Sequence, residues 1–304
     1  MKLLLTGAFK YSKAQLDTIR ALGFEVICLE QESSPLQVDV TEVEAVVCNS
    51  LFFHQGIRQF KNLKFIQLLS AGLDRVPLEY IEQKGIRLYN AGDVYSIPMA
   101  EWAVLKILEI YKDSRHFYRA QNERRWEKKR DLLELAGKKA AIIGLGNVGQ
   151  ATAKRLKAFG VEITGIDIRK VESEFTDHNF MIDRLDEALK QSDIIILTLP
   201  LNEETRHLIN ADRLKFMDDK SVLVNLSRGG IIDEAALVSA LQNGKFRGIA
   251  LDVFEEEPLP PDNPLWGFDR VIITPHNSYV SDKVQERLFK LILDNLSMNN
   301  NAEK

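Results

Sequence analysis

Short apolar runs alternate with amphipathic segments along most of the chain. The alternation occupies the first third of the sequence and restarts more strongly after residue 138. It predicts parallel strands joined by right-handed helical crossovers, and the near-continuous apolar runs indicate strands buried on both faces. The expected strands lie at residues 3–5, 25–29, 45–48, 65–69 and 87–89 in the first series, and at 140–143, 161–166, 194–197, 222–224, 249–251 and 271–273 in the second.

The segments between these runs have helical periodicity. Residues 12–22 and 150–159 fit helices, and so do residues 233–243, with Asp233 as the N-cap and Gly244 as the stop. From residue 99 to about 127 the pattern predicts one long connecting helix. Its apolar positions exceed a single stripe, so they pack either within the chain or against a second subunit. A final helix at 282–296 is expected to return to the first series.

Composition narrows the class of protein. With 304 residues, of which 45% are hydrophobic and 28% charged, the chain fits a globular protein of two domains. A formal net charge of −4 gives no reason to expect nucleic acid or an anionic membrane as a partner. The apolar start ends at Thr6, too early for a secretory signal, and Cys28 and Cys48 are interpreted as reduced core thiols. A cytoplasmic location is therefore expected.

A glycine-rich sequence, GLGNVG at residues 144–149, follows one predicted strand and opens a predicted helix. Alone the pattern is a weak signal, but this strand–turn–helix context is what dinucleotide binding requires. The first glycine permits a tight turn, the second lets the backbone approach a pyrophosphate, and the third allows close helix–strand packing. The residues expected to contact the cofactor here are Gly144, Gly146, Asn147, Val148 and Gly149.

Asp167 ends the next predicted strand. A carboxylate there accepts hydrogen bonds from both ribose hydroxyls and repels a 2′-phosphate, which favours NAD over NADP. The nearby Arg169 and Lys170 soften this discrimination, so NADP stays possible. The strand predicted at 194–197 is followed by Thr198, Leu199 and Pro200. This tripeptide is expected to lie over the cofactor; the alternative is an ordinary turn at the sheet edge.

Three polar residues, Arg228, Glu257 and His276, each follow a predicted strand of the second series. The carboxyl ends of parallel strands share the edge at which ligands bind, so we expect the three side chains to converge. A guanidinium holds a carboxylate, a histidine moves a proton, and an acid keeps that histidine charged. Singly they fit a surface cation, a solvated acid and a turn residue; together they fit the reduction of an anionic carbonyl compound. The other histidines lack metal-ligand spacing, and no metal site is expected.

The sequence resembles the D-isomer-specific 2-hydroxyacid dehydrogenase family over nearly its whole length. The segments that carry the resemblance occur in the family's order. They are residues 144–149, 198–205, 225–233, 251–258 and 274–276, together with 70–74, Asn90, Ala100 and Glu101 nearer the N-terminus.

The resemblance implies two Rossmann-like domains with the substrate in the cleft, and usually a dimer built around the nucleotide domain. Residues 98–280 would form the NAD-binding Rossmann domain. Residues 1–97 and 281–304 would form a flavodoxin-like substrate-binding domain that is discontinuous in sequence. The fold class is therefore α/β with two parallel sheets, and a homodimer is expected.

The resemblance also implies roles for single residues. Arg228 would bind and polarise a 2-oxo acid, His276 would donate the proton, and Glu257 would pair with His276. Asp252 would contact the nicotinamide carboxamide. The backbone amides of two further residues would hold the substrate carboxylate, unless that loop is only a turn that glycine permits. They are Ala71 and Gly72.

The expected function is an NAD(P)-dependent oxidoreductase acting between a small 2-oxo acid, such as glyoxylate or hydroxypyruvate, and a D-2-hydroxy acid. The alternative is an NAD-sensing, corepressor-like binding protein on the same fold; formate oxidation is a third possibility, which the short N-terminal region disfavours. Where the family has small residues after the histidine, this chain has NSYV at 277–280, so the choice of substrate stays open. Residues 51–53, LFF, are interpreted either as an apolar wall of the site or as core.

Overall fold

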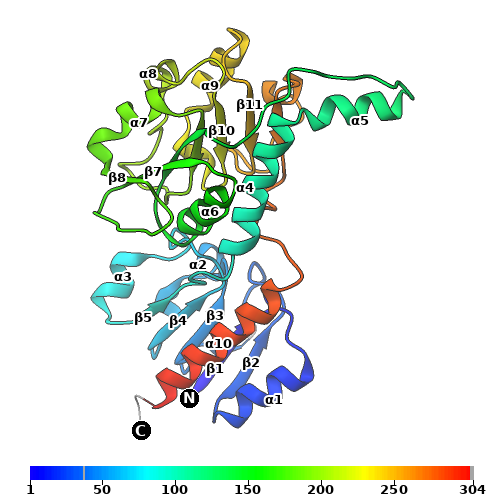
Figure 1. The fold of residues 1–304 in the computed structure, drawn as a ribbon. Helices are drawn as coiled ribbons and strands as arrows, with labels where there is room; N and C mark the ends of the chain where they lie inside the picture. The colour runs from blue at the N-terminus through cyan, green and yellow to red at the C-terminus, as the bar shows by residue number, and fades with distance from the viewer. Residues whose placement is uncertain (37, 302–304) are drawn as a thin grey trace. The chain divides into compact units, whose positions relative to one another are not determined.

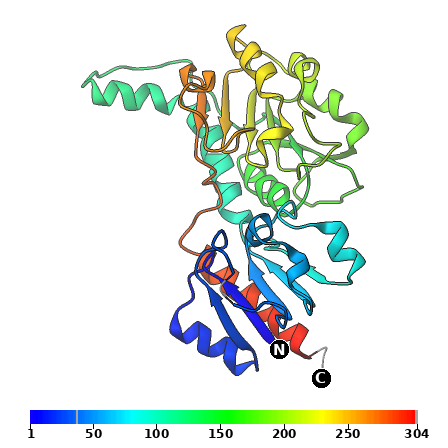
Figure 2. The same ribbon diagram turned by 180° about the vertical axis from the view of Figure 1, so that it is seen from behind.

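The computed structural model describes residues 1–36 and 38–301. It divides into two compact units, Met1–Tyr95 with Ser281–Lys304, and Ser96–Val280. Each unit contains one parallel sheet (Figures 1 and 2). Among the described residues, no helix combines the length and apolar character that crossing a membrane requires.

The first unit has a five-stranded sheet in the order β2-β1-β3-β4-β5, which is the flavodoxin-like order. Its strands are β1 Lys2–Thr6, β2 Glu25–Leu29, β3 Ala45–Cys48, β4 Phe65–Leu68 and β5 Arg87–Tyr89. Its helices are α1 Lys13–Ala21, α2 Leu51–His54, the 3₁₀ turn η1 Ile57–Gln59, α3 Leu78–Gln83 and α10 Val284–Asn301.

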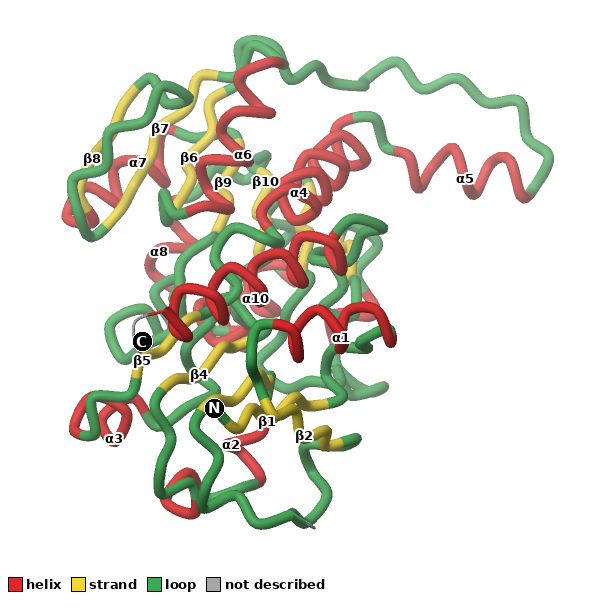
Figure 3. Tube along the Cα trace, turned by 90° about the horizontal axis from the view of Figure 1, so that it is seen from below, coloured by secondary structure: helices red, strands yellow, loops and turns green. Residues whose placement is uncertain are grey.

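Helices cover both faces of this sheet, because successive strand residues point to opposite sides. Helices α1 and α10 lie side by side on one face (Figures 1 and 3), where Ile19 and Ile292 join the same core cluster as Leu3 and Leu5. A buried amide pair also joins α10 to the sheet, since Asn295 Nδ2 donates to Gln67 Oε1 at 2.5 Å. These contacts explain why the last helix belongs to the first unit.

The second unit has a seven-stranded sheet in the order β12-β11-β10-β9-β6-β7-β8. Its strands are β6 Lys139–Ile143, β7 Glu162–Asp167, β8 His178–Met181, β9 Ile194–Leu197, β10 Val222–Asn225, β11 Gly248–Leu251 and β12 Val271–Ile273. Its α-helices are α4 Ser96–Tyr111, α5 Ser114–Asn122, α6 Asn147–Ala158, α7 Leu185–Gln191, α8 Ala211–Phe216 and α9 Glu234–Gln242. The 3₁₀ turns are η2 Ile182–Arg184, η3 Gly229–Ile231 and η4 Pro264–Gly267.

The strand order of the second unit reverses beside β6, which pairs with β7 on one side and with β9 on the other. Helices α4 and α6 pack on one face of this sheet, and α7, α8 and α9 pack on the other. In open α/β sheets, ligands bind beyond the carboxyl ends of the strands at such a reversal. The glycine turn after β6 lies at this point.

The predicted fold class is confirmed, and each predicted strand is present with bounds that agree to within one residue. Strand β8 was not predicted, because its sequence, HNFM, is mostly exposed and lacks an apolar run. The prediction of a single connecting helix was wrong. The chain breaks it at Asp113, whose φ of 47° is left-handed, so that α4 ends at Tyr111 and α5 begins at Ser114. Cys48 is a core thiol as expected, whereas Cys28 is exposed.

Candidate active site

The glycine turn connects β6 to α6. Gly144 has a φ of +100°, a conformation that side chains disfavour, so this turn requires glycine. A Cβ on Gly149 would lie 2.0 Å from the Gly144 carbonyl oxygen, which shows how closely α6 packs against the turn. Gly146 is the N-cap of α6 and has no side chain to cap it. The positive end of the helix dipole and its first N–H groups therefore fit a phosphate group.

Asp167, the last residue of β7, lies beside this turn. Its Oδ2 accepts a hydrogen bond from Leu145 N–H at 2.8 Å, and its Oδ1 accepts one from Arg169 N–H at 3.2 Å. Two backbone donors thus hold the carboxylate at the carboxyl end of the strand next to the glycine turn, which is the position that a ribose-binding acid occupies.

The tripeptide after β9 packs directly on the same turn. Thr198 Oγ1 donates to the Gly144 carbonyl oxygen at 2.6 Å. A Cβ on Gly144 would lie 2.9 Å from Leu199 N, and Leu199 is buried whereas Pro200 is exposed. Thr198 and Leu199 therefore stabilise the turn, and Pro200 offers the exposed surface.

His276 and Glu257 form a hydrogen-bonded pair. Nδ1 of His276 lies 2.8 Å from Oε2 of Glu257, and Oε1 of Glu257 accepts a hydrogen bond from Phe254 N–H at 3.0 Å. Burial alone would raise the pKa of the Glu257 carboxyl, but the hydrogen bonds from His276 and Phe254 outweigh it and lower this pKa. The charges of His276 and Arg228 act in the same direction. Glu257 is therefore a carboxylate at neutral pH.

Arg228 follows β10 in a loop that Asn225 shapes. Asn225 Nδ2 donates to the Arg228 carbonyl oxygen at 3.0 Å, while Asn225 Oδ1 accepts from Ser227 N–H at 3.1 Å. Arg228 Nη1 donates to the Ser227 carbonyl oxygen at 2.8 Å. The charge of Arg228 also contributes to the low pKa of Glu257. Arg228, Glu257 and His276 follow the neighbouring strands β10, β11 and β12, so the three predicted residues lie at one edge of one sheet.

Asp252 is buried and hydrogen-bonded within the protein. It is 0% exposed, and its two carboxylate oxygens accept hydrogen bonds from Thr274, Asn277 and Ser278. The carboxylate therefore binds the Thr274 hydroxyl and the backbone N–H groups of the two residues that follow His276. Neither Asn225 nor these contacts of Asp252 were predicted, because the sequence carries no signal for which backbone N–H a buried side chain will meet.

Several residues near the histidine were only partly anticipated. The ring of Tyr279 stands at 84° to that of His276, with centroids 6.2 Å apart, so the phenol is indeed next to the imidazole. His207 lies at the surface, with its side chain 42% exposed and Nε2 3.0 Å from Oε1 of Glu255. In the first unit Leu51 is core, whereas Phe53 is exposed.

The loop expected to hold a carboxylate lies in the first unit, after β4. The Asn90 amide donates to the Ala71 carbonyl oxygen at 2.7 Å, and Ser70 Oγ donates to the Gly72 carbonyl oxygen at 2.9 Å. These bonds fix the carbonyl groups of the loop and so determine where its N–H groups point.

The chain is similar to known proteins in sequence and in fold. Residues 104–278 match the family model of the D-isomer specific 2-hydroxyacid dehydrogenase, NAD binding domain. A hydroxypyruvate reductase of Thermotoga maritima is 37% identical over 273 residues, which cover 87% of each chain. The D-lactate dehydrogenase of Aquifex aeolicus, crystallised with NAD and lactic acid, superposes with a TM-score of 0.83 at 26% identity, covering 99% of this chain and 96% of that one.

A D-3-phosphoglycerate dehydrogenase of Methanocaldococcus jannaschii is 38% identical over 243 residues. The match covers 79% of this chain but 46% of that protein, so this chain spans about half of that relative's length. The family model covers more than half of the chain, and it includes the glycine turn and all three residues of the constellation. The chain therefore belongs to the D-isomer specific 2-hydroxyacid dehydrogenase family, and residues 104–278 are its NAD-binding domain.

Proposed function

We propose that this protein reduces a small 2-oxo acid to a D-2-hydroxy acid with NADH, and catalyses the reverse oxidation. The observation that carries the proposal is the 2.8 Å pair between His276 Nδ1 and Glu257 Oε2 at the carboxyl edge of a nucleotide-binding sheet. The names of the relatives, hydroxypyruvate reductase and D-lactate dehydrogenase, support this class of substrate.

A nicotinamide bound at this edge would supply a hydride to the carbonyl carbon of the substrate. Nε2 of His276 would donate a proton to the substrate oxygen and so neutralise the negative charge that develops there. Glu257 holds the ring in place through Nδ1. Arg228 binds the carboxylate of the substrate, to which a guanidinium presents two parallel donors. In the oxidation direction His276 accepts the proton from the hydroxyl group.

The residues around the turn fit a dinucleotide. The uncapped N-terminus of α6, with Asn147 and Val148 in its first turn, would hold the pyrophosphate. Asp167 would accept the ribose hydroxyls and would repel a 2′-phosphate, which supports NAD over NADP. Arg169 and Lys170 are exposed beside it, so NADPH is expected to be used less well and not to be excluded.

The remaining assignments rest on the family. The N–H groups of Ala71 and Gly72 would bind the substrate carboxylate, and the unit Met1–Tyr95 with Ser281–Lys304 would be the substrate-binding domain. Glyoxylate and hydroxypyruvate are the first substrates to test. A cytoplasmic location, without nucleic acid or membrane partners, agrees with the net charge of −4 and can be checked by cell fractionation.

The test is NADH consumption with a panel of glyoxylate, hydroxypyruvate, pyruvate and branched-chain 2-oxo acids, with formate and NAD in the reverse direction. His276→Ala should remove most of the rate while NADH still binds, and Arg228→Ala should chiefly raise the KM for the acid. Near-normal turnover in both variants would overturn the proposed roles. NADH binding without turnover of any acid would instead indicate a dinucleotide sensor.

We infer a homodimer from the segment that connects α4 to β6. Helix α5 and the residues after it extend away from the sheet of their own unit (Figures 1 and 2), and Leu133 N–H donates to the Tyr111 carbonyl oxygen at 3.1 Å where the segment returns. We call residues 114–133 the arm. Trp126 on the arm is 96% exposed, and Tyr118 is 60% exposed. Aromatic side chains exposed to this degree are typical of surfaces that a partner covers.

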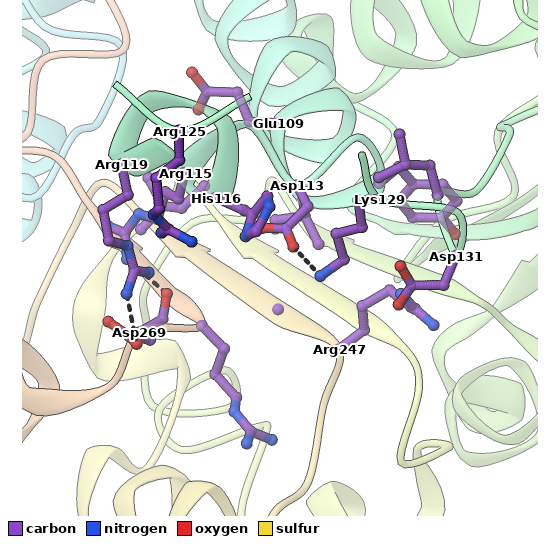
Figure 4. Close-up of a pocket in the computed structure, with 16 residues that line it drawn as sticks. Glu109, Asp113, Arg115, His116, Arg119, Arg125, Lys129, Asp131, Arg247 and Asp269 are labelled. Carbon is purple, nitrogen blue, oxygen red and sulfur yellow. Dashed lines mark hydrogen bonds and ion pairs between the residues drawn. The ribbon is translucent and has the colours of Figure 1, made fainter. Parts of the chain in front are cut away.

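A polar cavity of about 450 Å³ lies between the base of the arm and the first residues of β11 and β12. Arg115 donates to the Asp269 carbonyl oxygen at 2.7 Å, and Arg119 lies 3.3 Å from the Asp269 carboxylate, so the arm is held in place (Figure 4). Light scattering should give the mass of a dimer, and Trp126→Ser should weaken it, whereas the exposed Trp266→Ser outside the arm should not. A monomeric native protein would refute the inference.

A further inference from the structure

The backbone at His276 has a conformation that non-glycine residues seldom adopt. Its φ is +49°, in the left-handed region, where a Cβ is disfavoured. Such a conformation persists only when surrounding contacts impose it, and it is often found at functional sites. His276 carries the imidazole of the proposed proton donor, so the contacts that impose this backbone also determine where the imidazole lies.

Asp252 supplies these contacts. Its carbonyl oxygen accepts a hydrogen bond from His276 N–H at 2.8 Å. Its carboxylate accepts from the next two backbone donors, Asn277 N–H to Oδ1 and Ser278 N–H to Oδ2, each at 2.9 Å. The hydroxyl of Thr274 also donates to Oδ1. The N–H groups of two consecutive residues, Asn277 and Ser278, therefore bind one carboxylate, an arrangement in which the backbone forms an anion-binding nest.

Asp252 is in turn joined to the loop of Arg228. Its N–H donates to the Asn225 carbonyl oxygen at 3.0 Å, and the Asn225 side chain holds the Arg228 carbonyl group. Asp252 has no exposed side-chain surface, so its charge is buried and satisfied by donors of the protein. A buried carboxylate is costly unless its oxygens are hydrogen-bonded, and here the loop at 276–278 provides most of the donors.

We propose that Asp252 is a positioning residue for His276. Its carboxylate holds Asn277 and Ser278 in the nest, directly after the histidine, and this fixes the left-handed backbone from which the imidazole meets Glu257. The inference rests on the proposed function. The role acts through the histidine and is distinct from the expected contact with the nicotinamide carboxamide, which the Kd for NADH tests separately.

The kinetic test is Asp252→Asn, which keeps the size of the side chain. The amide has one acceptor oxygen, so it can bind only one of the N–H groups of Asn277 and Ser278 and faces the other with a donor NH₂ group. Misplacing a reacting group by about 1 Å costs on the order of 100-fold in rate, so kcat should fall about 100-fold while the Kd for NADH changes less than about threefold. In a His276→Ala background the same substitution should cost no further rate, because Asp252 acts through that histidine.

Asp177→Asn is the matched control. Asp177 also accepts a backbone N–H, from Ile163 at 2.8 Å, and pairs with Lys157, but it contacts neither the nest nor the Arg228 loop. This variant should lose some thermal stability and keep its kcat. A large rise in the Kd for NADH with little change in kcat in Asp252→Asn would overturn the proposal in favour of a direct cofactor contact.

A second readout does not depend on turnover. The amides of Asn277 and Ser278 should exchange with deuterium faster in Asp252→Asn than in the native protein, and a crystal structure should show His276 leaving its left-handed φ. Unchanged exchange together with an unchanged φ would refute the positioning role even if kcat falls. If the native protein reduces no 2-oxo acid, the proposed function fails, whereas the exchange measurement still decides the role of Asp252.

Discussion

A substitution in the pair formed by Glu257 and His276 should change catalysis strongly and stability only slightly. Glu257→Gln keeps the length of the side chain and one oxygen acceptor but removes the charge. In the native protein one oxygen lies 2.8 Å from His276 Nδ1 and the other accepts from Phe254 N–H at 3.0 Å. Glutamine can satisfy one of these contacts and presents an NH₂ group to the other. The substitution therefore removes the carboxylate that pairs with the imidazole.

The effect on stability should be small. Both side chains of the pair keep 34% of their surface exposed, so solvent screens their attraction. Ion pairs at exposed positions contribute about 0.2–1 kcal/mol to the free energy of unfolding. For a protein of this size about 1 kcal/mol corresponds to a change in Tm of roughly 2–4 °C. The expected loss in Tm for Glu257→Gln at pH 7 is therefore no more than about 4 °C.

The effect on catalysis should be large, because proton transfer by a positioned side chain contributes about 10²–10⁴-fold to a rate. With His276 still present but no longer paired to a carboxylate, we expect kcat/KM for the 2-oxo acid to fall about 100-fold. Glu255→Gln is the matched control. Glu255 belongs to the same run of glutamates, and its Oε1 also lies 3.0 Å from a histidine nitrogen, Nε2 of His207. This substitution should leave the rate within about threefold of native.

The dependence of stability on pH provides an internal check. The pKa of Glu257 is lowered in the folded protein, so its contribution to stability is fully present above the unfolded value of about 4.3 and is lost as the pH falls through the lowered folded value. The difference in Tm between native protein and Glu257→Gln should accordingly shrink as the pH falls through this lowered value. Equal losses of rate in Glu257→Gln and Glu255→Gln, or a rate loss that only follows unfolding, would refute the reasoning.

Three further predictions concern other parts of the chain. Asp167→Ser removes the charge that would repel a 2′-phosphate, so the ratio of kcat/KM for NADPH to that for NADH should rise about tenfold or more; an unchanged ratio would show that Asp167 does not contact the ribose. Gly149→Ala places a methyl group 2.0 Å from the Gly144 carbonyl oxygen, so NADH fluorescence titration should show lost binding in a protein that circular dichroism shows to be folded; normal binding would contradict the close packing. Burial alone would raise the pKa of the Glu32 carboxyl, but hydrogen bonds from Asn49 and other residues outweigh this effect and lower the pKa. Glu32→Gln should therefore lower the free energy of unfolding in urea by about 2 kcal/mol at pH 7, and by less below pH ~4. A loss that does not depend on pH would contradict the assignment.

Much of the fold could be predicted because it depends on periodicity. Strands such as Ile194–Leu197 are wholly buried and apolar, and the helices between them have ordinary start and stop residues. The prediction failed where tertiary contacts outweigh local pattern. Strand β8, His178–Met181, is an edge strand that pairs with β7 without being apolar, and the break between α4 and α5 depends on a left-handed Asp113 that no residue pattern requires.

The same distinction between local pattern and tertiary contacts applies to the candidate site. Arg228, Glu257 and His276 could be identified because parallel strands end at one edge, so residues that follow neighbouring strands β10, β11 and β12 must lie near one another. The contacts that fix their orientation could not be identified, because they join side chains to backbone N–H groups whose directions exist only after folding.

Asn225 and Asp252 show what this means for catalysis. The Asn225 side chain holds the Arg228 loop and its carbonyl group holds Asp252, which in turn holds the loop of His276. Arg228 and His276 are thus positioned by one continuous chain of hydrogen bonds that runs through the buried residues Asn225 and Asp252. Because both groups share this support, a substitution at Asn225 should displace them together, lowering kcat and raising the KM for the acid in the same variant. A change in only one of these constants would mean that each loop is held independently.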